Sequence, residues 1–459
     1  MEHFSLAVIG SGSGNVLIPD YRDGRKAAVI ESRTFGGTCI NRGCIPSKML
    51  VHTADVALNV RLASDFGIQA DVASVDWTAI RHRVTARIEA TSIRGREGRI
   101  KSAHVSLFDG RARFAGPREL VIDDDVHIEA DQIVIATGGH PFIPDVVAHA
   151  GVDFHTSDTI MWIDELPASM VILGGGSVAA EFAHVFSSLG VQIHIVTKAP
   201  TLLETLDAEI SRRFTSKVAG QWDLHLGGSV SGVQKGPGGI SVSLENGTRV
   251  SAELLLVATG RKPNTDGLGL ELAGVTCRDD GRIVVDDYGM AAPGIWAVGD
   301  VSSPFELKHV ANAEARTVAH NLSHPEDLRV LPHEWVPSAV FTEPEIASVG
   351  ARSQDLEGKH YVEAVQSYGD TAYGWALQDH DGICKLYADP AAGTLLGAHI
   401  LGPYASLLIT PLIQAVAHGQ RVADMARGQY WIHPALSEVV ENALLKLPLD
   451  AEVRDGQLH

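Results

Sequence analysis

A repeated pattern organises the first two thirds of this 459-residue chain: an apolar strand, a glycine cluster and an Ala-Thr-Gly ending. In the first copy the apolar residues 6–9 lead into Gly10-Ser-Gly-Ser-Gly14, and residues 130–138 close it. The second copy runs from residues 171–174 to residues 252–260. A strand that turns at glycines is typical of nucleotide-binding units, so the repeat predicts two nucleotide-binding domains of similar plan.

The two copies differ in length, and the chain continues beyond them. The first copy is the longer one, and its extra residues include the cysteines at positions 39 and 44. After Gly260 another apolar strand is expected near residues 294–299, followed by a helix from about 310 to 321. We therefore expect an α/β fold with two Rossmann-like domains and a C-terminal α+β domain. The expected boundaries are 1–145 with 265–330 for a discontinuous first domain, 146–264 for the second and 331–459 for the third.

Composition and charge limit the classes of binding partner and the cellular compartment that we expect for this chain. A formal net charge of −19 disfavours nucleic acid and anionic membrane surfaces. The N-terminus has no signal-peptide pattern, and no apolar run approaches the roughly 18–20 residues of a membrane span. Four cysteines cannot form a secreted disulfide framework. We expect a cytoplasmic protein in which Cys277 and Cys384 are ordinary thiols.

The first glycine cluster has the pattern of a phosphate-binding turn. Gly10, Gly12 and Gly14 stand where a strand should turn into a helix, so backbone N–H groups and the helix dipole can face a pyrophosphate. Glu31 follows at the distance at which a carboxylate accepts hydrogen bonds from an adenosine ribose. Asn15 departs from the pattern, which usually has a third small residue there. The alternative is an ordinary turn.

The second glycine cluster matches the same pattern but differs at the ribose position. Gly174, Gly176 and Ala179 fit the turn. At the end of the following strand Thr197 stands where NAD-selective sites carry an acid, and Lys198 comes next. A lysine attracts a 2′-phosphate, so the sequence favours NADPH over NADH. The alternative is that Lys198 is solvated surface charge.

The strongest single signal is the segment from Gly36 to Lys48, which contains Cys39 and Cys44. Residues five apart in a helix are separated by about 7.5 Å of axial rise. A disulfide needs Cα atoms within roughly 4.4–6.8 Å, so bridging requires a distorted turn, for which Gly43 is suited. Pro46 suits the first turn of a following helix, whose positive end would stabilise a thiolate at Cys44. No Cys or His follows at ligand spacing, so we expect a redox pair and no metal.

Near the C-terminus His433 and Glu438 flank a proline-marked helix start. Most of the 21 histidines are expected to be structural or surface residues. Thiol chemistry, however, needs an acid that protonates the departing thiolate, and a histidine oriented by a carboxylate is the usual device. The sequence therefore favours His433 and Glu438 as an acid–base pair.

Together these residues resemble the pyridine nucleotide-disulfide oxidoreductases, relatives of glutathione reductase and dihydrolipoyl dehydrogenase. The resemblance covers essentially the whole chain. Its marks occur in order: the first glycine cluster with Glu31, the Gly36–Lys48 motif, both Ala-Thr-Gly strands, Ala297–Asp300, Val340–Pro344 and His433-Pro434. It implies an FAD domain, an NADPH domain inserted into it, and a C-terminal domain that forms a homodimer.

The resemblance also implies roles for individual residues. Cys39 would attack the substrate disulfide, and Cys44 would face the flavin. Lys48 would lie beside the flavin, paired with Glu181, and His433 with Glu438 would come from the other subunit. The FAD-binding residues are then Gly10, Gly12, Gly14, Glu31, Gly37, Thr38, Lys48, Gly138 and Asp300, which would hold the ribityl chain. The NADPH-binding residues are Gly174, Gly176, Ala179, Lys198 and Gly260.

Two departures concern the nicotinamide nucleotide. Ser177 occupies the place of a tyrosine that covers the nicotinamide pocket in glutathione reductase. Glu204 stands where a second basic residue often supports the 2′-phosphate, which leaves Lys198 alone there.

Within the family, residues 368–375 and 429–442 resemble one branch that reduces the disulfide of a small sugar-linked thiol. The main alternative is an NAD-linked dihydrolipoyl dehydrogenase, which Thr197 and Lys198 disfavour. A mercuric reductase is disfavoured because the C-terminal tail lacks a cysteine pair. A redox-inactive homologue is disfavoured because Cys39, Cys44 and Lys48 are all present.

Overall fold

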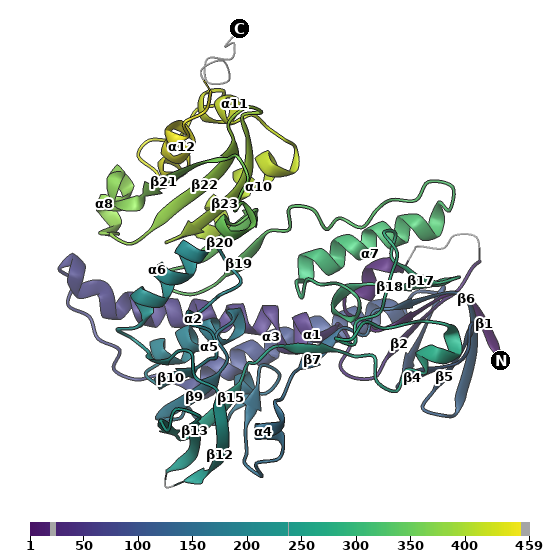
Figure 1. The fold of residues 1–459 in the computed structure, drawn as a ribbon. Helices are drawn as coiled ribbons and strands as arrows, with labels where there is room; N and C mark the ends of the chain where they lie inside the picture. The colour runs from purple at the N-terminus through teal and green to yellow at the C-terminus, as the bar shows by residue number, and fades with distance from the viewer. Residues whose placement is uncertain (19–23, 237, 451–459) are drawn as a thin grey trace.

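The first sheet combines strands from the beginning of the chain with strands near residue 295 (Figure 1). The computed structural model describes residues 1–18, 24–236 and 238–450. Strands β1, β2, β3, β6 and β18 pair in parallel, as expected for apolar strands buried on both faces. The eight strands are β1 (Glu2–Ile9), β2 (Ala27–Glu31), β3 (Val105–Asp109), β4 (Ala112–Gly116), β5 (Glu119–Ile122), β6 (Val126–Ile135), β17 (Met290–Ala292) and β18 (Ile295–Ala297).

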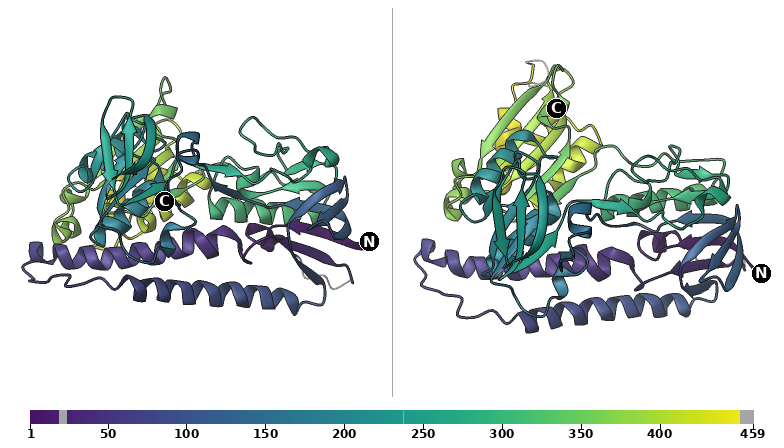
Figure 2. Two further views of the ribbon diagram at one scale, coloured as in Figure 1. Left: turned by 90° about the horizontal axis from the view of Figure 1, so that it is seen from below. Right: turned by 60° about the horizontal axis from the view of Figure 1, so that its bottom comes forward.

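Two long helices extend from this sheet toward the second one. Figure 2 shows α2 and α3 side by side along the length of the molecule. The side chain of Asp76 caps α3 by accepting a hydrogen bond from the Ala79 amide at 2.9 Å. The helices associated with the first sheet are η1 (Ser13–Leu17), α1 (Gly37–Arg42), α2 (Cys44–Leu62), η2 (Ala63–Phe66), α3 (Trp77–Ile100), η4 (Leu270–Ala273), η5 (Gly299–Val301) and α7 (Lys308–Ser323).

The second sheet is parallel, with the order β11-β10-β9-β15-β8. Helices α5 and α6 cover one face, and an antiparallel meander covers the other. Asn246 and Gly247 lie in the tight turn that joins β13 to β14. The elements are β8 (His155–Thr156), β9 (Ser169–Leu173), α5 (Ser177–Ser188), β10 (Gln192–Val196), α6 (Ala208–Val218), β11 (Asp223–His225), β12 (Val230–Gly236), β13 (Gly239–Leu244), β14 (Arg249–Ala252) and β15 (Leu254–Val257).

Short elements connect these two parts. Strands β7 and β16 pair with each other in antiparallel fashion where the chain enters and leaves the second sheet. The connecting elements are β7 (Gly139–Pro141), α4 (Asp145–Ala148), η3 (Ile160–Trp162) and β16 (Arg261–Pro263).

The C-terminal part is an antiparallel sheet with helices packed on it, drawn in green and yellow in Figure 1. Its order is β19-β20-β23-β22-β21. Its strands are β19 (Ser338–Val340), β20 (Ile346–Gly350), β21 (Val362–Ser367), β22 (Ile383–Asp389) and β23 (Thr394–Leu401). Its helices are η6 (Ser353–Asp355), η7 (Tyr368–Asp370), α8 (Ala372–Leu377), α9 (Ala405–Leu408), α10 (Thr410–Ala417), α11 (Val422–Arg427) and α12 (Ser437–Lys446).

The largest apolar core anchors the cysteine-bearing helix to the second sheet. Leu50 of α2 and Trp77 of α3 belong to the same buried cluster as Phe186 of α5 and Ile172 of β9. Burial of this kind stabilises by roughly 25 cal/mol per Å² of apolar surface. The start of α2 is therefore held in a fixed relation to α5. Among the described residues, no helix is long and apolar enough to cross a membrane.

Candidate active site

A cavity of about 1680 Å³ extends from the ends of β1 and β2 along α1 and α2 to α5 and α7. It brings together eleven of the residues that the sequence predicts for the site. They are Gly10, Gly12, Glu31, Gly37, Thr38, Cys39, Cys44, Lys48, Gly138, Glu181 and Asp300. Glycine-rich backbone, the carboxylate of Glu31 and the thiols of Cys39 and Cys44 therefore all line the same cavity.

The first glycine cluster forms a turn that side chains would block. Gly10 has φ +108°, and a Cβ there would lie 2.3 Å from the Ala136 carbonyl oxygen. A Cβ on Gly37 would lie 2.7 Å from the Cα of Gly12, so the turn touches the helix that carries Cys39. Gly14 does not line the cavity: a Cβ there would collide with Val8 and Ala136, so Gly14 allows the turn to pack on β1.

The helix expected after this turn is shorter than predicted. Only the five-residue 3-10 helix η1 follows within the described residues up to Ile18. Pro19 comes next, and the residue before a proline avoids the helical region; Ile18 is accordingly extended, with ψ 109°. The prediction of a full helix dipole at this turn is therefore wrong, and backbone N–H groups remain as the phosphate-facing feature.

Glu31 stands at the end of β2 as predicted and is already oriented. Its carboxylate accepts hydrogen bonds from the Ser11 amide at 3.0 Å, the Ser11 hydroxyl at 2.6 Å and the Arg33 amide at 2.8 Å. The Ser11 hydroxyl in turn accepts from the Gly36 amide at 2.8 Å. This chain of contacts fixes the carboxylate between the glycine turn and the cysteine segment.

Cys39 and Cys44 lie on two helices that Gly43 separates. The predicted break is confirmed, because α1 ends at Arg42 and α2 begins at Cys44. A Cβ on Gly43 would lie 3.0 Å from the Thr38 carbonyl oxygen and 3.3 Å from the Cα of Cys39, so a side chain here would push α1 and α2 apart by a few tenths of an ångström. Cys44 is the first residue of a 19-residue helix, whose N-terminus favours negative charge.

The two thiols are hydrogen-bonded to each other and differ in acidity. The Cys39 S–H donates to Cys44, and this bond, together with burial, raises the pKa of Cys39. The same bond, with the charge of Lys48, lowers the pKa of Cys44 to about 6 against the opposing effect of burial. The first thiolate therefore forms on Cys44, and Cys39 needs a base before it can act as a nucleophile.

The predicted ion pair between Lys48 and Glu181 joins α2 to α5. Lys48 Nζ lies 2.5 Å from Glu181 Oε2. Phe341, which the sequence did not single out, completes the arrangement: its amide donates to Glu181 Oε1 at 3.1 Å, and its ring centroid lies 4.7 Å from Lys48 Nζ. Phe341 belongs to the Val340–Pro344 mark of the resemblance, which was the only sequence signal for it.

Lys308 is a second lysine in the cavity, which sequence analysis missed. It begins α7 and donates from Nζ to the Ser13 hydroxyl at 2.9 Å. Burial lowers the pKa of Lys308, and the charges of Cys39 and Cys44 raise it. No local spacing identifies such a lysine, because only the fold brings α7 to the thiols.

The second glycine cluster repeats the backbone of the first. Gly174 has φ +126°, and a Cβ there would lie 2.1 Å from the Ala258 carbonyl oxygen. Helix α5 begins at Ser177, and Ala179 is fully buried against the sheet. Lys198 is exposed at the end of β10, and Glu204 is exposed in the loop after it. Gly174, Gly176, Ala179, Lys198 and Gly260 lie outside the cavity, whereas Ser177 lines it.

His433 and Glu438 form the predicted pair, but away from the cysteines of their own chain. His433 Nδ1 lies 2.5 Å from Glu438 Oε1, and the histidine side chain is 70% exposed. Neither residue lines the cavity. Figure 1 shows α12 in the C-terminal part, far from α1. One chain alone therefore does not bring this acid–base pair to Cys39.

Comparison with known proteins decides the family. Residues 4–316 match "Pyridine nucleotide-disulphide oxidoreductase", and residues 336–444 match the dimerisation domain of the same family. The chain belongs to the pyridine nucleotide-disulphide oxidoreductases. The resemblance inferred from the motifs is confirmed.

Individual relatives of this oxidoreductase span its whole length. It is 46% identical to mycothione reductase from Mycobacterium tuberculosis, over 97% of this chain and 100% of the relative. It is 32% identical to dihydrolipoyl dehydrogenase from Chlamydia muridarum, over 97% of each chain. The HOCl-induced flavoprotein disulfide reductase from Escherichia coli has a similar fold, with a TM-score of 0.87 and 24% identity over 97% of this chain and 99% of that one.

The oxidoreductase uses FAD and a pyridine nucleotide, and the cavity fits FAD. Its volume of about 1680 Å³ is ample for a dinucleotide, and the Gly10 turn offers backbone approach to a pyrophosphate. Glu31 stands where a ribose would be bound. Asp300 lines the cavity at η5; burial raises the pKa of its carboxyl, and Arg261 lies 3.5 Å from it.

Proposed function

We propose that this oxidoreductase reduces mycothione, the disulfide of mycothiol, with electrons from NADPH. The observation that carries a disulfide substrate is the thiol pair formed by Cys39 on α1 and Cys44 at the start of α2, in which a hydrogen bond from Cys39 helps to lower the pKa of Cys44 to about 6. Support for mycothione comes from the 46% identity to a mycothione reductase. The stretches 368–375 and 429–442, which first indicated this branch, lie on the C-terminal part with Trp375 and Tyr430 exposed.

The chemistry uses the two thiols in different roles. FAD, when bound, passes an electron pair from the nicotinamide to the Cys39–Cys44 disulfide. In the resulting dithiol Cys44 holds the negative charge beside Lys48, and Cys39 gives its proton to a base, for which His433 is suited. The Cys39 thiolate attacks one sulfur of the substrate disulfide, forming a mixed disulfide, and the departing thiolate takes the proton back from His433. Cys44 then attacks the Cys39 sulfur, which restores the Cys39–Cys44 disulfide and expels the second product as a thiolate that takes a proton from water.

We infer that the active unit is a homodimer in which the partner's histidine completes the site. The match to a dimerisation domain supports this, as does the distance between α12 and α1 within one chain. Around His433, Tyr430 and Ile432 are exposed, and Glu438 Oε2 is buried without a hydrogen-bond partner among the described residues. A dithiol cycle supplied by NADPH suits the reducing cytoplasm, where we place the enzyme.

The preference for NADPH rests on the end of β10. Thr197 carries no charge, and Lys198 is exposed beside it. A lysine attracts the 2′-phosphate, whereas an acid in this position would repel it. Glu204 is exposed in the same loop and supplies no second cation. We therefore assign Lys198 to the 2′-phosphate. Ser177, which lines the cavity, places only a small hydroxyl group on the nicotinamide side.

Steady-state oxidation of NADPH and of NADH by the purified holoenzyme tests the substrate. Mycothione, glutathione disulfide and lipoamide are offered separately. We expect turnover with NADPH and mycothione to exceed every other pair. Turnover chiefly with NADH and lipoamide would instead make the chain a dihydrolipoyl dehydrogenase. That activity is the second candidate because the chain is 32% identical to such an enzyme.

Half-reaction kinetics test the residue roles. Cys39→Ser and Cys44→Ser should each abolish disulfide reduction while FAD and NADPH still bind. His433→Ala should slow the oxidative half-reaction far more than flavin reduction by NADPH. Equal slowing of both half-reactions would contradict a proton-transfer role for His433.

A further inference from the structure

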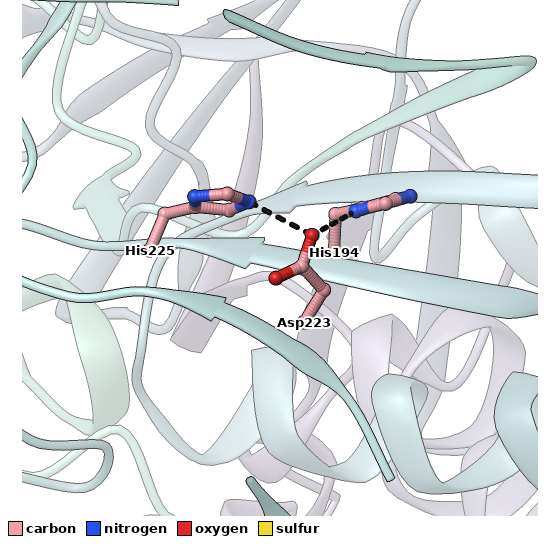
Figure 3. A group of neighbouring side chains, drawn as sticks. All are labelled: His194, Asp223 and His225. Atoms are coloured by element: carbon pink, nitrogen blue, oxygen red, sulfur yellow. Dashed lines mark hydrogen bonds and ion pairs between the residues drawn. The ribbon is translucent and has the colours of Figure 1, made fainter. Parts of the chain in front are cut away.

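We propose that His194, Asp223 and His225 form a binding site for one divalent cation of the zinc type. The three residues lie on neighbouring strands of the second sheet, and Figure 3 shows both imidazole rings directed at the same carboxylate. The sequence predicted no metal because His194 and Asp223 are 29 positions apart, and only the strand pairing brings them together.

The ligand atoms are already close to the spacing that an ion requires. Asp223 Oδ2 lies 2.8 Å from His194 Nδ1 and 3.1 Å from His225 Nε2. One ligand atom from each residue lies within 4.8 Å of the other two. A tetrahedral zinc ion with ligands at about 2.0–2.2 Å holds them roughly 3.4 Å apart, so the three side chains must adjust their spacing on the order of an ångström to admit the ion.

The strands hold the two histidines, and the carboxylate is the adjustable ligand. His194 and His225 are 12% and 20% exposed, whereas Asp223 is 53% exposed. The β10–β11 register pairs His194 with Asp223 and Val196 with His225, so all three side chains lie on one face. Solvent can reach the site from the Asp223 side and supply the remaining ligand as water.

The donor set selects the kind of ion. Two imidazole nitrogens and one carboxylate oxygen suit Zn²⁺, Ni²⁺ or Cu²⁺, whereas Mg²⁺ and Ca²⁺ prefer oxygen alone. Three protein ligands leave an open coordination position, as in zinc sites that keep a water. The chain's formal net charge of −19 also favours cations near its surface.

An ion bound at this site would also stabilise the strand ends around it. Strand β11 has three residues and is the edge of its sheet, and among the described residues its strand partner is β10. Immediately after the site the His225 carbonyl accepts from the Thr197 amide at 3.1 Å. An ion held by both strands would therefore steady the end of β10 that carries Thr197 and Lys198.

Calorimetric titration of the oxidised holoenzyme with Zn²⁺ tests the site. In the oxidised enzyme Cys39 and Cys44 are joined, so their thiols do not compete for zinc. We expect one equivalent per chain, weakened roughly tenfold or more in His194→Gln and in His225→Gln, since loss of even an outer partner costs about 10–100-fold in affinity. Glutamine keeps a hydrogen bond to Asp223 while removing the imidazole ligand.

His149→Gln is the matched control. This exposed histidine belongs to the same part of the chain, and its ring bonds the Asp145 carbonyl at 3.0 Å. We expect His149→Gln to bind zinc as the unaltered enzyme does. Zinc should also raise the melting temperature of the unaltered enzyme and of His149→Gln but not of His225→Gln.

Two results would overturn the proposal. One is no saturable zinc binding at micromolar concentrations by the unaltered oxidised enzyme. The other is unchanged stoichiometry and affinity in the His194→Gln/His225→Gln double variant, with FAD content confirming that it is folded. Either result would leave the cluster as two histidine–carboxylate hydrogen bonds.

Discussion

The two glycine clusters of this chain share a backbone conformation and differ in the residue at the end of the next strand. At Gly10 and at Gly174 a positive φ brings the turn against a carbonyl oxygen of the Ala-Thr-Gly strand, Ala136 in one copy and Ala258 in the other. The next strand ends in Glu31 in the first copy and is followed directly by Thr197 in the second. We propose that the shared turn binds a phosphate in each copy and that the residue at or directly after the strand end selects the ribose that is accepted.

The segments after those strands differ even more. In the first copy residues 32–104 form α1, α2 and α3 before the sheet resumes, and they carry both thiols. In the second copy residues 197–222 contain only α6 before β11. The redox chemistry therefore belongs to an extension of one copy, while the other copy keeps the simpler plan.

Gly174→Ala should have the largest effect, because it removes the shared backbone from one copy. The new Cβ would lie 2.1 Å from the Ala258 carbonyl oxygen at a positive φ. A cost of about 3 kcal/mol corresponds to a loss of roughly a hundredfold in kcat/KM for NADPH. FAD content, measured by absorbance, should stay unchanged because the Gly10 turn lies on the first sheet.

Gly220→Ala is the control for this variant. A Cβ at Gly220 would meet nothing within 4 Å, so activity should be retained. Normal NADPH turnover in Gly174→Ala would show that the two turns are not equivalent.

Thr197→Glu should come second, because it gives the second copy the strand-end residue of the first. Bringing like charges together costs several kcal/mol before screening, so KM for NADPH should rise by roughly ten- to a hundredfold while NADH use is retained. Thr197 is 9% exposed and lies against Gly175, so Thr197→Gln controls for size. Equal losses with NADPH and NADH in Thr197→Glu would mean that packing, and not charge, is responsible.

Lys198→Ala should also weaken the preference for NADPH over NADH, but by less than Thr197→Glu. Lys198 is exposed, so its attraction for a 2′-phosphate is screened and amounts to about 1 kcal/mol, or roughly fivefold in KM for NADPH. KM for NADH should not change. If KM for NADPH and KM for NADH are both unchanged in Lys198→Ala, another residue of the loop after β10 must determine the preference for NADPH.

Lys48→Met should shift a pH profile, because the thiols of the first copy depend on nearby charge. The hydrogen bond from Cys39 and the charge of Lys48 lower the pKa of Cys44 to about 6, so its thiolate exists above that pH and is lost as the pH falls through it. Without Lys48 the midpoint of alkylation by iodoacetamide should move upward, and the rate at pH 7 should fall. Lys26→Met, which removes an exposed partner of Glu2, should leave the profile unchanged.

Features that depend on neighbouring residues were predictable. The glycine turns follow from backbone conformations that Cβ atoms forbid, and the break at Gly43 follows from the spacing of Cys39 and Cys44. The helix expected near 310–321 is present as α7, and the helix start expected between His433 and Glu438 is present at Ser437, where α12 begins. One local prediction was wrong: Pro19 reduces the helix after Gly14 to the short η1.

Features that depend on distant residues needed either the family resemblance or the tertiary structure. The resemblance predicted the pair of Lys48 with Glu181, 133 positions away, and the packing of α2 on α5 makes that contact. No sequence signal predicted that strand pairing brings His194 to Asp223 or that Lys308 reaches Ser13 across 295 positions. The sequence by itself determined the turns, the thiol pair and the family, because each rests on short motifs of residues close in the chain. Only the tertiary structure decided that Lys308 lies in the cavity with the thiols and that His194, Asp223 and His225 meet, because both depend on how separate elements pack.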